Sequence, residues 1–378
     1  MQLTGAIAQR FPLVARIRPA CLPLEARVGK LQELADAGTR RADPGLASTV
    51  FNQAALLASD LALPDLAREL CHQHAALYLR ARPLPAMSAI RALEPVVNLA
   101  RLHIRAGHGD KGHHLIAALY SAVTNGAEMT ADGITVPADL TDDPAQRAEV
   151  RRWLWRVLLA DGTRALTGAG RWQEALEHLE RHKGIGSRIL DGRQVAILAR
   201  ATTGDSAGAL ALLEATEPGD PWENAVTAVL TALCRLSSRT DARAAIDHCQ
   251  QLEEGKGLAL FTTRLVLTAV DSTSRTDPDG ARDLAKLLIA RTGTSLDGYA
   301  VREILQHDFC SNHLNPAESS ILTAASAACA LGAGGMPAVL RRQLDDSLAQ
   351  AANVLKSNPL DRTTPGGDPL ERGTLIND

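Results

Sequence analysis

The chain has 378 residues, of which 46% are hydrophobic and only 3% aromatic, and its formal net charge is -3. Such a chain can bury a large core, whereas its weak negative charge argues against a general nucleic-acid binder, which must neutralise many phosphates. No stretch reaches the roughly eighteen uninterrupted apolar residues of a membrane-spanning helix. We therefore expect neither nucleic acid nor a membrane as a partner.

The apolar residues are mainly alanine, leucine and valine, which suit close helix packing, and β-branched residues at period two are almost absent. The fold class predicted from this pattern is all-α. The cysteines form no CxxC pair and most lie in Ala/Leu-rich stretches, which indicates a reducing, cytoplasmic protein. They are Cys21, Cys71, Cys234, Cys249, Cys310 and Cys329.

Residues 1–44 are predicted to be an N-terminal segment with a short helix, and 45–124 to hold the first helical repeats. In this second region, two amphipathic helix pairs are predicted, with turns at Pro64–Asp65 and at Gly109–Asp110. Pro64 suits the first turn of a helix and Asp65 supplies negative charge at its N-terminus. Each pair buries too little surface to be stable alone, so neighbouring pairs must stack.

An insertion at 125–143 interrupts the succession of helix pairs. It carries Asp132-Gly133 between two short extended runs, which predicts a β-hairpin. Two interpretations remain open for it: a lid at a binding face, or a tolerated surface loop. Asp143-Pro144 then fits the start of the next helix, as an N-cap followed by a first-turn proline.

Regular repeats are predicted from 144 to 295, with turns near Arg171, Asp205, Asp241 and Pro278. The first three of these positions are 34 and then 36 residues apart. Helices without a clear period follow at 296–356 and are expected to cap the stack. The Pro/Gly-rich tail at 357–378 is predicted to be disordered.

Two segments carry a resemblance to a known family. AGRWQEALEHLE is similar to the turn, aromatic residue and second-helix opening of tetratricopeptide repeats, and TGDSAGALALLE is a thinner match. The resemblance spans about Gly45 to Ala290, but the usual first-helix Trp, Gly and Tyr and the terminal Pro are missing. It implies a TPR-like α-solenoid of antiparallel helix pairs; an irregular helical bundle is the alternative.

Polar residues recur inside the apolar runs of the first helices, which line the concave groove in the family that the chain resembles. Such a ladder suits hydrogen bonding to a peptide backbone or to carboxylates. The alternative is that these residues form the polar stripe that every surface helix needs. The candidates are Asn52, Gln53, Asn98, Arg101, Arg156, Asp161, Arg164, Arg193, Gln194 and Asn224.

Two clusters contain residue types that bind metals: His103, His108, His113 and His114, and the trio His307, Cys310 and His313. Neighbouring histidines in a helix point about 100° apart, so His113 and His114 rarely bind one ion, and HDFCSNH at 307–313 fits a packed helix end more simply. Acidic pairs at 142–143 and 345–346 lack the aromatic residues of a terpene synthase pocket, and no phosphate-binding loop or catalytic triad spacing is present. We predict no metal and no cofactor, and favour a role that is not enzymatic.

The leading hypothesis is a cytoplasmic interaction module that binds a peptide or protein segment in its concave groove. The alternative is an enzyme, or a partner subunit of one, with a small-molecule site near the 125–143 insertion. A nucleic-acid regulator has support only from the arginines on one predicted helix, at 147, 151, 152 and 156. A homo-oligomer remains open.

Overall fold

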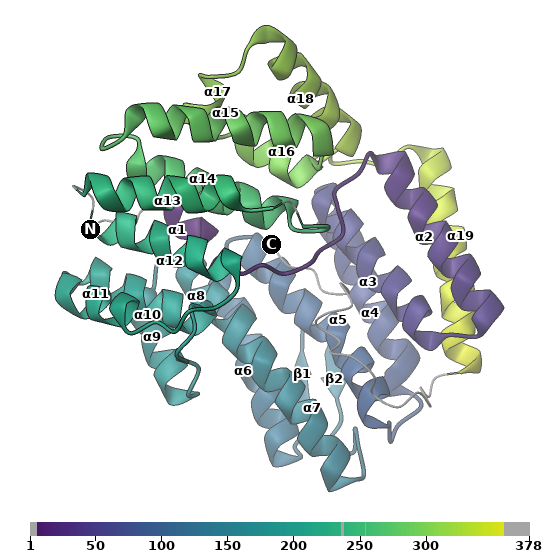
Figure 1. Cartoon of the computed structure of the whole chain (residues 1–378). Helices are drawn as coiled ribbons and strands as arrows, with labels where there is room; N and C mark the ends of the chain where they lie inside the picture. Colours follow the sequence, from purple (N-terminus) through teal and green to yellow (C-terminus); the bar gives the residue numbers. More distant parts are fainter. Residues whose placement is uncertain (1–5, 236–237, 254, 359–378) are drawn as a thin grey trace. The chain divides into compact units, whose positions relative to one another are not determined.

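The computed structural model describes residues 6–235, 238–253 and 255–358 (Figure 1). The chain is 73% α-helical with one two-stranded antiparallel hairpin, which confirms the predicted all-α class. Of the tail predicted to be disordered, all but Ser357 and Asn358 lies outside the described residues. Within the described part of the chain, no helix is long and apolar enough to cross a membrane.

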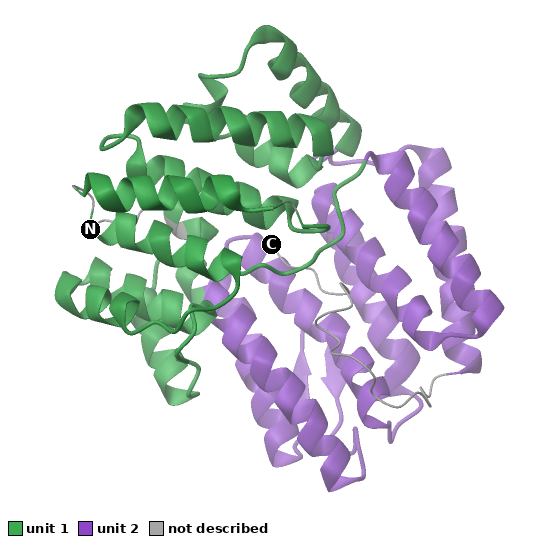
Figure 2. Ribbon diagram, in the orientation of Figure 1, with its two compact units in different colours: residues 1–22, 166–329 green, residues 23–165, 330–378 purple. Residues whose placement is uncertain are grey.

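The chain divides into two compact units (Figure 2). Unit 1 comprises residues 1–22 and 166–329, and unit 2 comprises 23–165 and 330–378. Each unit is therefore assembled from two separate stretches of the sequence. The helices predicted to form one C-terminal cap at 296–356 are shared between the two units.

In unit 2, consecutive helices pack on one another, and the last helix returns to pack on α2 and α3. Its buried core is mainly leucine, alanine and valine. The elements are α2 (Leu24–Arg41), α3 (Pro44–Asp60), α4 (Pro64–Leu79), α5 (Ala86–Arg105), α6 (Gly109–Asn125), β1 (Met129–Ala131), β2 (Ile134–Val136), α7 (Pro144–Val157), a π-helical turn η1 (Leu158–Gly162) and α19 (Ala338–Ser357). Helix α8 (Thr163–Gly168) spans the boundary between the units.

In unit 1, α10 packs on α11, α12 on α13 and α14 on α15, so the predicted packing of sequential helix pairs is confirmed. Figure 1 shows α14 and α15 side by side. The elements are α1 (Ala6–Arg10), α9 (Trp172–Arg181), α10 (Asp191–Thr202), α11 (Ser206–Glu214), α12 (Pro221–Cys234), α13 (Arg239–Gln251), α14 (Ala259–Thr273), α15 (Pro278–Ser295), α16 (Gly298–Leu305), α17 (Asp308–Ser311) and α18 (Pro316–Cys329).

Aspartate–proline pairs start several of these helices. The carboxylates of Asp43, Asp143 and Asp277 each accept a hydrogen bond from a first-turn backbone N–H, and a proline follows each of them. Proline fits there because its fixed φ suits a helix and its missing N–H would have no partner. The predicted cap at Asp143 is confirmed. Asp241, near which a turn is predicted, instead lies in the first turn of α13, which begins at Arg239 behind a Ser238 cap.

The insertion forms the predicted hairpin, with Met129 paired to Val136 and Ala131 to Ile134. Asp132 and Gly133 make its turn with φ values of 48° and 79°. Two successive positive φ values define a type I′ turn, whose twist matches that of the strands. The Asp132 carboxylate lies 2.6 Å from His103 Nε2, which ties the hairpin to α5. Its role as a lid remains a prediction.

Candidate functional site

A polar pocket of about 380 Å³ opens in unit 1 where α14, α16 and α17 meet the N-terminal helix α1. Arg264 and Asp271 are seven residues apart on α14, so both side chains lie on one face of that helix. Glu303 is on α16, and His307 follows the end of that helix. The lining residues are Gln9, Arg10, Arg264, Asp271, Glu303, Gln306, His307, Asp308 and Phe309.

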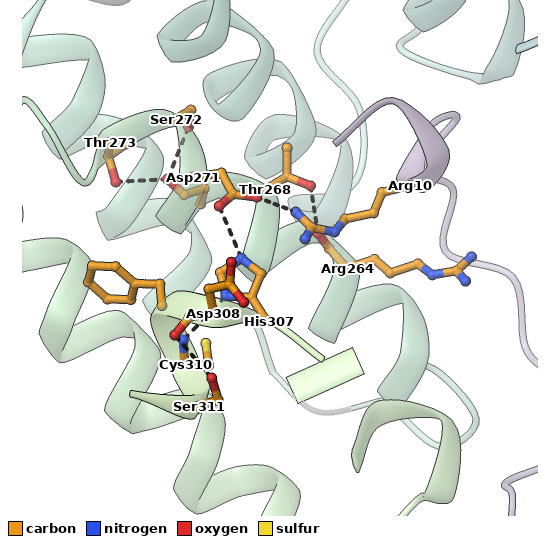
Figure 3. Close-up of polar contacts among 12 residues, drawn as sticks. Arg10, Arg264, Thr268, Asp271, Ser272, Thr273, His307, Asp308, Cys310 and Ser311 are labelled. Atoms are coloured by element: carbon orange, nitrogen blue, oxygen red, sulfur yellow. Dashed lines mark hydrogen bonds and ion pairs between the residues drawn. The ribbon is translucent and has the colours of Figure 1, made fainter. Parts of the chain in front are cut away.

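At the inner wall of this pocket, Arg10 and His307 converge on Asp271 (Figure 3). Arg10 Nη1 donates to one carboxylate oxygen at 2.6 Å, and His307 Nε2 lies 3.0 Å from the other. Burial acts to raise the pKa of Asp271, but the hydrogen bond from His307 and the positive charge of Arg10 outweigh it and hold the pKa below its usual value. Asp271 is therefore a carboxylate with both oxygens occupied.

The His307 imidazole is also fully engaged. Its side chain caps α17, because Nδ1 accepts the backbone N–H of Cys310 at 3.3 Å. A nitrogen that accepts carries no proton, so Nε2 is the nitrogen that donates to Asp271. Neither nitrogen is left to take a proton from a substrate. The arrangement resembles an acid–base pair in composition but serves to hold α17 on α14.

The outer wall of the polar pocket presents hydrogen-bond acceptors. Arg264 donates from Nε and Nη2 to a single oxygen of Glu303, at 2.9 and 2.8 Å. Within the described residues, the other oxygen of Glu303 and the exposed Asp308 carboxylate have no ion-pair or hydrogen-bond partner. Three carboxylates and two guanidinium groups line the pocket, so these five side chains together carry one net negative charge.

The Cys310 thiol beside the pocket is weakly reactive. Burial, and to a lesser extent the charge of Asp271, raises its pKa to about 12, although Arg10 opposes this. A protonated thiol is neither a nucleophile nor a metal ligand. His313, the last residue of the HDFCSNH segment, lies with Nδ1 2.7 Å from the carbonyl of Phe309. Among the described residues, no group of three His, Cys, Asp or Glu side chains could hold a metal ion.

Four of the predicted groove residues meet in unit 2, inside the core. Asn52 Oδ1 accepts from Asn98 at 3.0 Å, and Asn98 Oδ1 accepts from Arg101 at 3.2 Å. Arg101 donates to both oxygens of Asp161, at 3.0 and 2.6 Å, and all four residues are at most 5% exposed. Asp161 lies in the π-helical turn η1, and its partner Arg101 lies on α5. These residues are thus engaged with one another.

Glu94, which the sequence analysis missed, extends this hydrogen-bond network. Its carboxylate accepts from Asn52 Nδ2 at 2.7 Å. Burial raises the pKa of Glu94 to about 7, partly offset by the Asn52 hydrogen bond and the charges of Arg91 and Arg101. Glu94, Asn98 and Arg101 follow the i, i+4, i+7 spacing of one helix face, and that spacing was the available signal.

The other predicted groove residues are dispersed. Arg193 donates to the carbonyls of Gly186 and Leu212, and Gln194 bonds both the N–H and the carbonyl of Leu13. Both side chains therefore fasten loops to α10. Gln53 and Arg164 are half-buried, and Arg156 and Asn224 are exposed. None of the ten candidates lines the polar pocket, and their part in ligand binding remains a prediction.

Comparison with protein-family models, with curated proteins and with solved structures finds no match to this chain. The chain is a predominantly helical protein of packed sequential helices with one short hairpin.

Proposed function

We propose that this chain is a binding protein that holds a peptide or protein segment by accepting a basic side chain into the polar pocket of unit 1. The observation that carries the proposal is the pair of unpartnered acceptors, Glu303 Oε2 and the Asp308 carboxylate, in a pocket with excess negative charge. A lysine or arginine side chain carries the donors that these acceptors lack.

The dimensions of the pocket support the same ligand. A volume of about 380 Å³ lies in the range of small-ligand sites and holds one long side chain with part of its backbone. The half-buried ring of Phe309 lies at its edge, where the aliphatic stem of lysine or arginine packs well. The engaged state of His307 favours binding over proton-transfer chemistry.

The proposal includes two finer statements about the chain. The helix pairs, with turns 34 to 36 residues apart, are proposed to form a degenerate TPR-like solenoid. A cytoplasmic location is proposed because the cysteines are free thiols. A small-molecule site beside the 125–143 insertion is the weaker candidate, because the cavity there measures about 10 Å³, room for about one water molecule.

The test uses fluorescently labelled peptides that are identical except for one central residue: lysine, glutamine or glutamate. We expect the lysine peptide to bind the full chain most tightly and the glutamate peptide least. Removing two carboxylates by Glu303→Gln and Asp308→Asn should weaken the lysine peptide by about tenfold, which corresponds to about 1.4 kcal/mol.

The matched control is Glu177→Gln with Asp283→Asn, which removes the same charge from exposed sites of unit 1 outside the pocket. Fluorescence polarisation measures each dissociation constant. Equal affinity for the three peptides, or equal losses in the pocket and control variants, would rule out the proposed site.

A further inference from the structure

A second cavity of unit 1 lies at the amino-terminal end of α14, away from Asp271 near the other end of that helix. Its volume is about 370 Å³. The loop 255–257, the first two turns of α14 and the last turns of α15 form its walls, and Ala20 of the N-terminal segment closes another side. It shares no lining residue with the polar pocket.

Backbone contacts fix the walls of this cavity. The N–H of Arg18 donates to the carbonyl of Gly257 at 3.1 Å, and the N–H of Gly298 donates to the carbonyl of Cys21 at 2.8 Å. Gly257 has a φ of 79°, and a Cβ there would lie 2.9 Å from the Arg18 carbonyl oxygen. The N-terminal segment is thus held between two loops, and the cavity is preformed.

Three threonine side chains line this cavity, and their hydroxyls make no hydrogen bond within the described part of the chain. Thr262, Thr263 and Thr292 are only 8%, 2% and 3% exposed, and their hydroxyls have no hydrogen-bond partner among the described residues. By contrast, Thr268 and Thr273 of the same helix α14 each donate to the carbonyl four residues earlier, at 2.7 Å. Because these three side chains line the cavity, their hydroxyls are available to a ligand that forms hydrogen bonds with them.

The charges around the cavity favour an anion. Helix α14 begins here, and its N-cap residue Leu258 offers no side-chain acceptor to the first-turn N–H groups. Lys256 adds a positive charge at the exposed rim. The lining also holds the Arg291 guanidinium and the Asp297 carboxylate, so its charged side chains sum to one net positive charge. The Asp297 carboxylate already accepts the N–H groups of Tyr299, Ala300 and Cys21.

We propose that this cavity binds a small aliphatic carboxylate. The carboxylate accepts from the first-turn N–H groups of α14 and from the hydroxyls of Thr262 and Thr263, with Lys256 balancing its charge. The aliphatic chain lies against Ala20, Ala259 and Leu288, which are apolar. A dianion such as phosphate would leave these apolar walls unused and is the less suitable ligand.

Isothermal titration calorimetry of the full chain tests this class of ligand with three probes: hexanoate, hexanol and inorganic phosphate. We expect hexanoate to bind at least about tenfold more tightly than either other probe, because only it has both a charged acceptor and an apolar chain. The proposal is overturned if hexanoate does not bind, if hexanol binds equally well, or if phosphate binds more tightly.

Variants of two threonines on the same helix locate the site. Thr263→Val removes a cavity hydroxyl while keeping the shape of the side chain, and it should weaken hexanoate by about tenfold. Thr268→Val is the control, because that hydroxyl bonds within α14 and lies outside the cavity, and it should leave the affinity unchanged. Equal effects of the two variants would contradict the assignment.

Thr263→Val also has an expected effect on stability. Its hydroxyl makes no bond within the protein, so its replacement by a methyl group should leave the melting temperature unchanged or raise it. A clear fall in melting temperature would show that the hydroxyl serves the fold, and would overturn its role as a ligand group. The comparison of the three probes decides the ligand class on the unaltered chain, whatever the variants do.

Discussion

Glu94→Gln should make unit 2 more stable at high pH and leave it nearly unchanged at low pH. Burial raises the pKa of Glu94 from 4.5 to about 7, with opposing contributions from the Asn52 hydrogen bond and from Arg91 and Arg101. A glutamine resembles the protonated carboxyl group, since it both donates and accepts, and it cannot ionise. The variant therefore isolates the effect of the buried charge.

The sign and size of the effect follow from the two pKa values. Between pH 4.5 and about 7 the folded chain keeps the proton that the unfolded chain has lost, so the free energy of unfolding falls as the pH rises. The values are about 2.5 pH units apart, and each unit is worth about 1.4 kcal/mol, so the total is about 3 kcal/mol. Above pH 7 the loss is constant.

Hydrogen–deuterium exchange of peptides from α5 measures this effect in unit 2 itself. Comparing variant and wild type at the same pH cancels the intrinsic pH dependence of exchange. We expect the stability difference to grow by about 2.5 kcal/mol from pH 5 to pH 8. Glu33→Gln, at an exposed site on α2, is the control and should show no such growth. A difference for Glu94→Gln that is constant with pH would refute the reasoning.

Three further predictions concern other parts of the chain. Arg101→Met leaves the Asp161 carboxylate buried without its partner and should lower the free energy of unfolding by about 3–5 kcal/mol, as measured by urea titration. Adding Asp161→Leu should recover most of that loss, and a double variant as unstable as Arg101→Met alone would contradict the buried ion pair. Gly133→Ala introduces a Cβ at a φ of 79° and 3.0 Å from His72, so hydrogen exchange in the hairpin should accelerate, with a loss of about 1 kcal/mol; unchanged exchange would contradict the strained turn. Burial and the charge of Asp271 raise the pKa of Cys310 to about 12, so this thiol should react with iodoacetamide far more slowly in the native chain than in the urea-unfolded chain. Mass spectrometry follows the reaction, and equal rates would contradict the burial of the thiol.

Local signals in the sequence predicted local structure well. Asp132-Gly133 predicted the hairpin, whose turn is type I′ in the structure, and Asp143-Pro144 predicted the start of α7. Both predictions depend on the backbone preferences of adjacent residues. The division into two units, each made of two distant stretches, has no such local signal. It depends on contacts such as those of α19 with α2 and α3, which bring together residues about 300 positions apart.

The polar residues show the same limit of prediction from local sequence. Their occurrence inside apolar helices was recognised, but a side chain such as Asn98 has the same pattern whether it faces a groove or a buried partner on another helix. The partner Asp161 reaches α5 through a π-helical turn that the sequence did not predict. The pocket of unit 1 was missed because Arg10, Asp271 and His307 are far apart in sequence and join three different elements.

Photo-crosslinking tests the proposed binding site most directly. A lysine peptide with a diazirine group on the residue next to the lysine is bound to the full chain, irradiated, and the crosslinked segment is identified by mass spectrometry. We expect crosslinks to fall on 298–311, in α16 and α17 around Glu303 and Asp308, and to be lost when a tenfold excess of unlabelled lysine peptide competes. Crosslinks that instead fall on unit 2, or that persist in the Glu303→Gln/Asp308→Asn variant, would contradict the account.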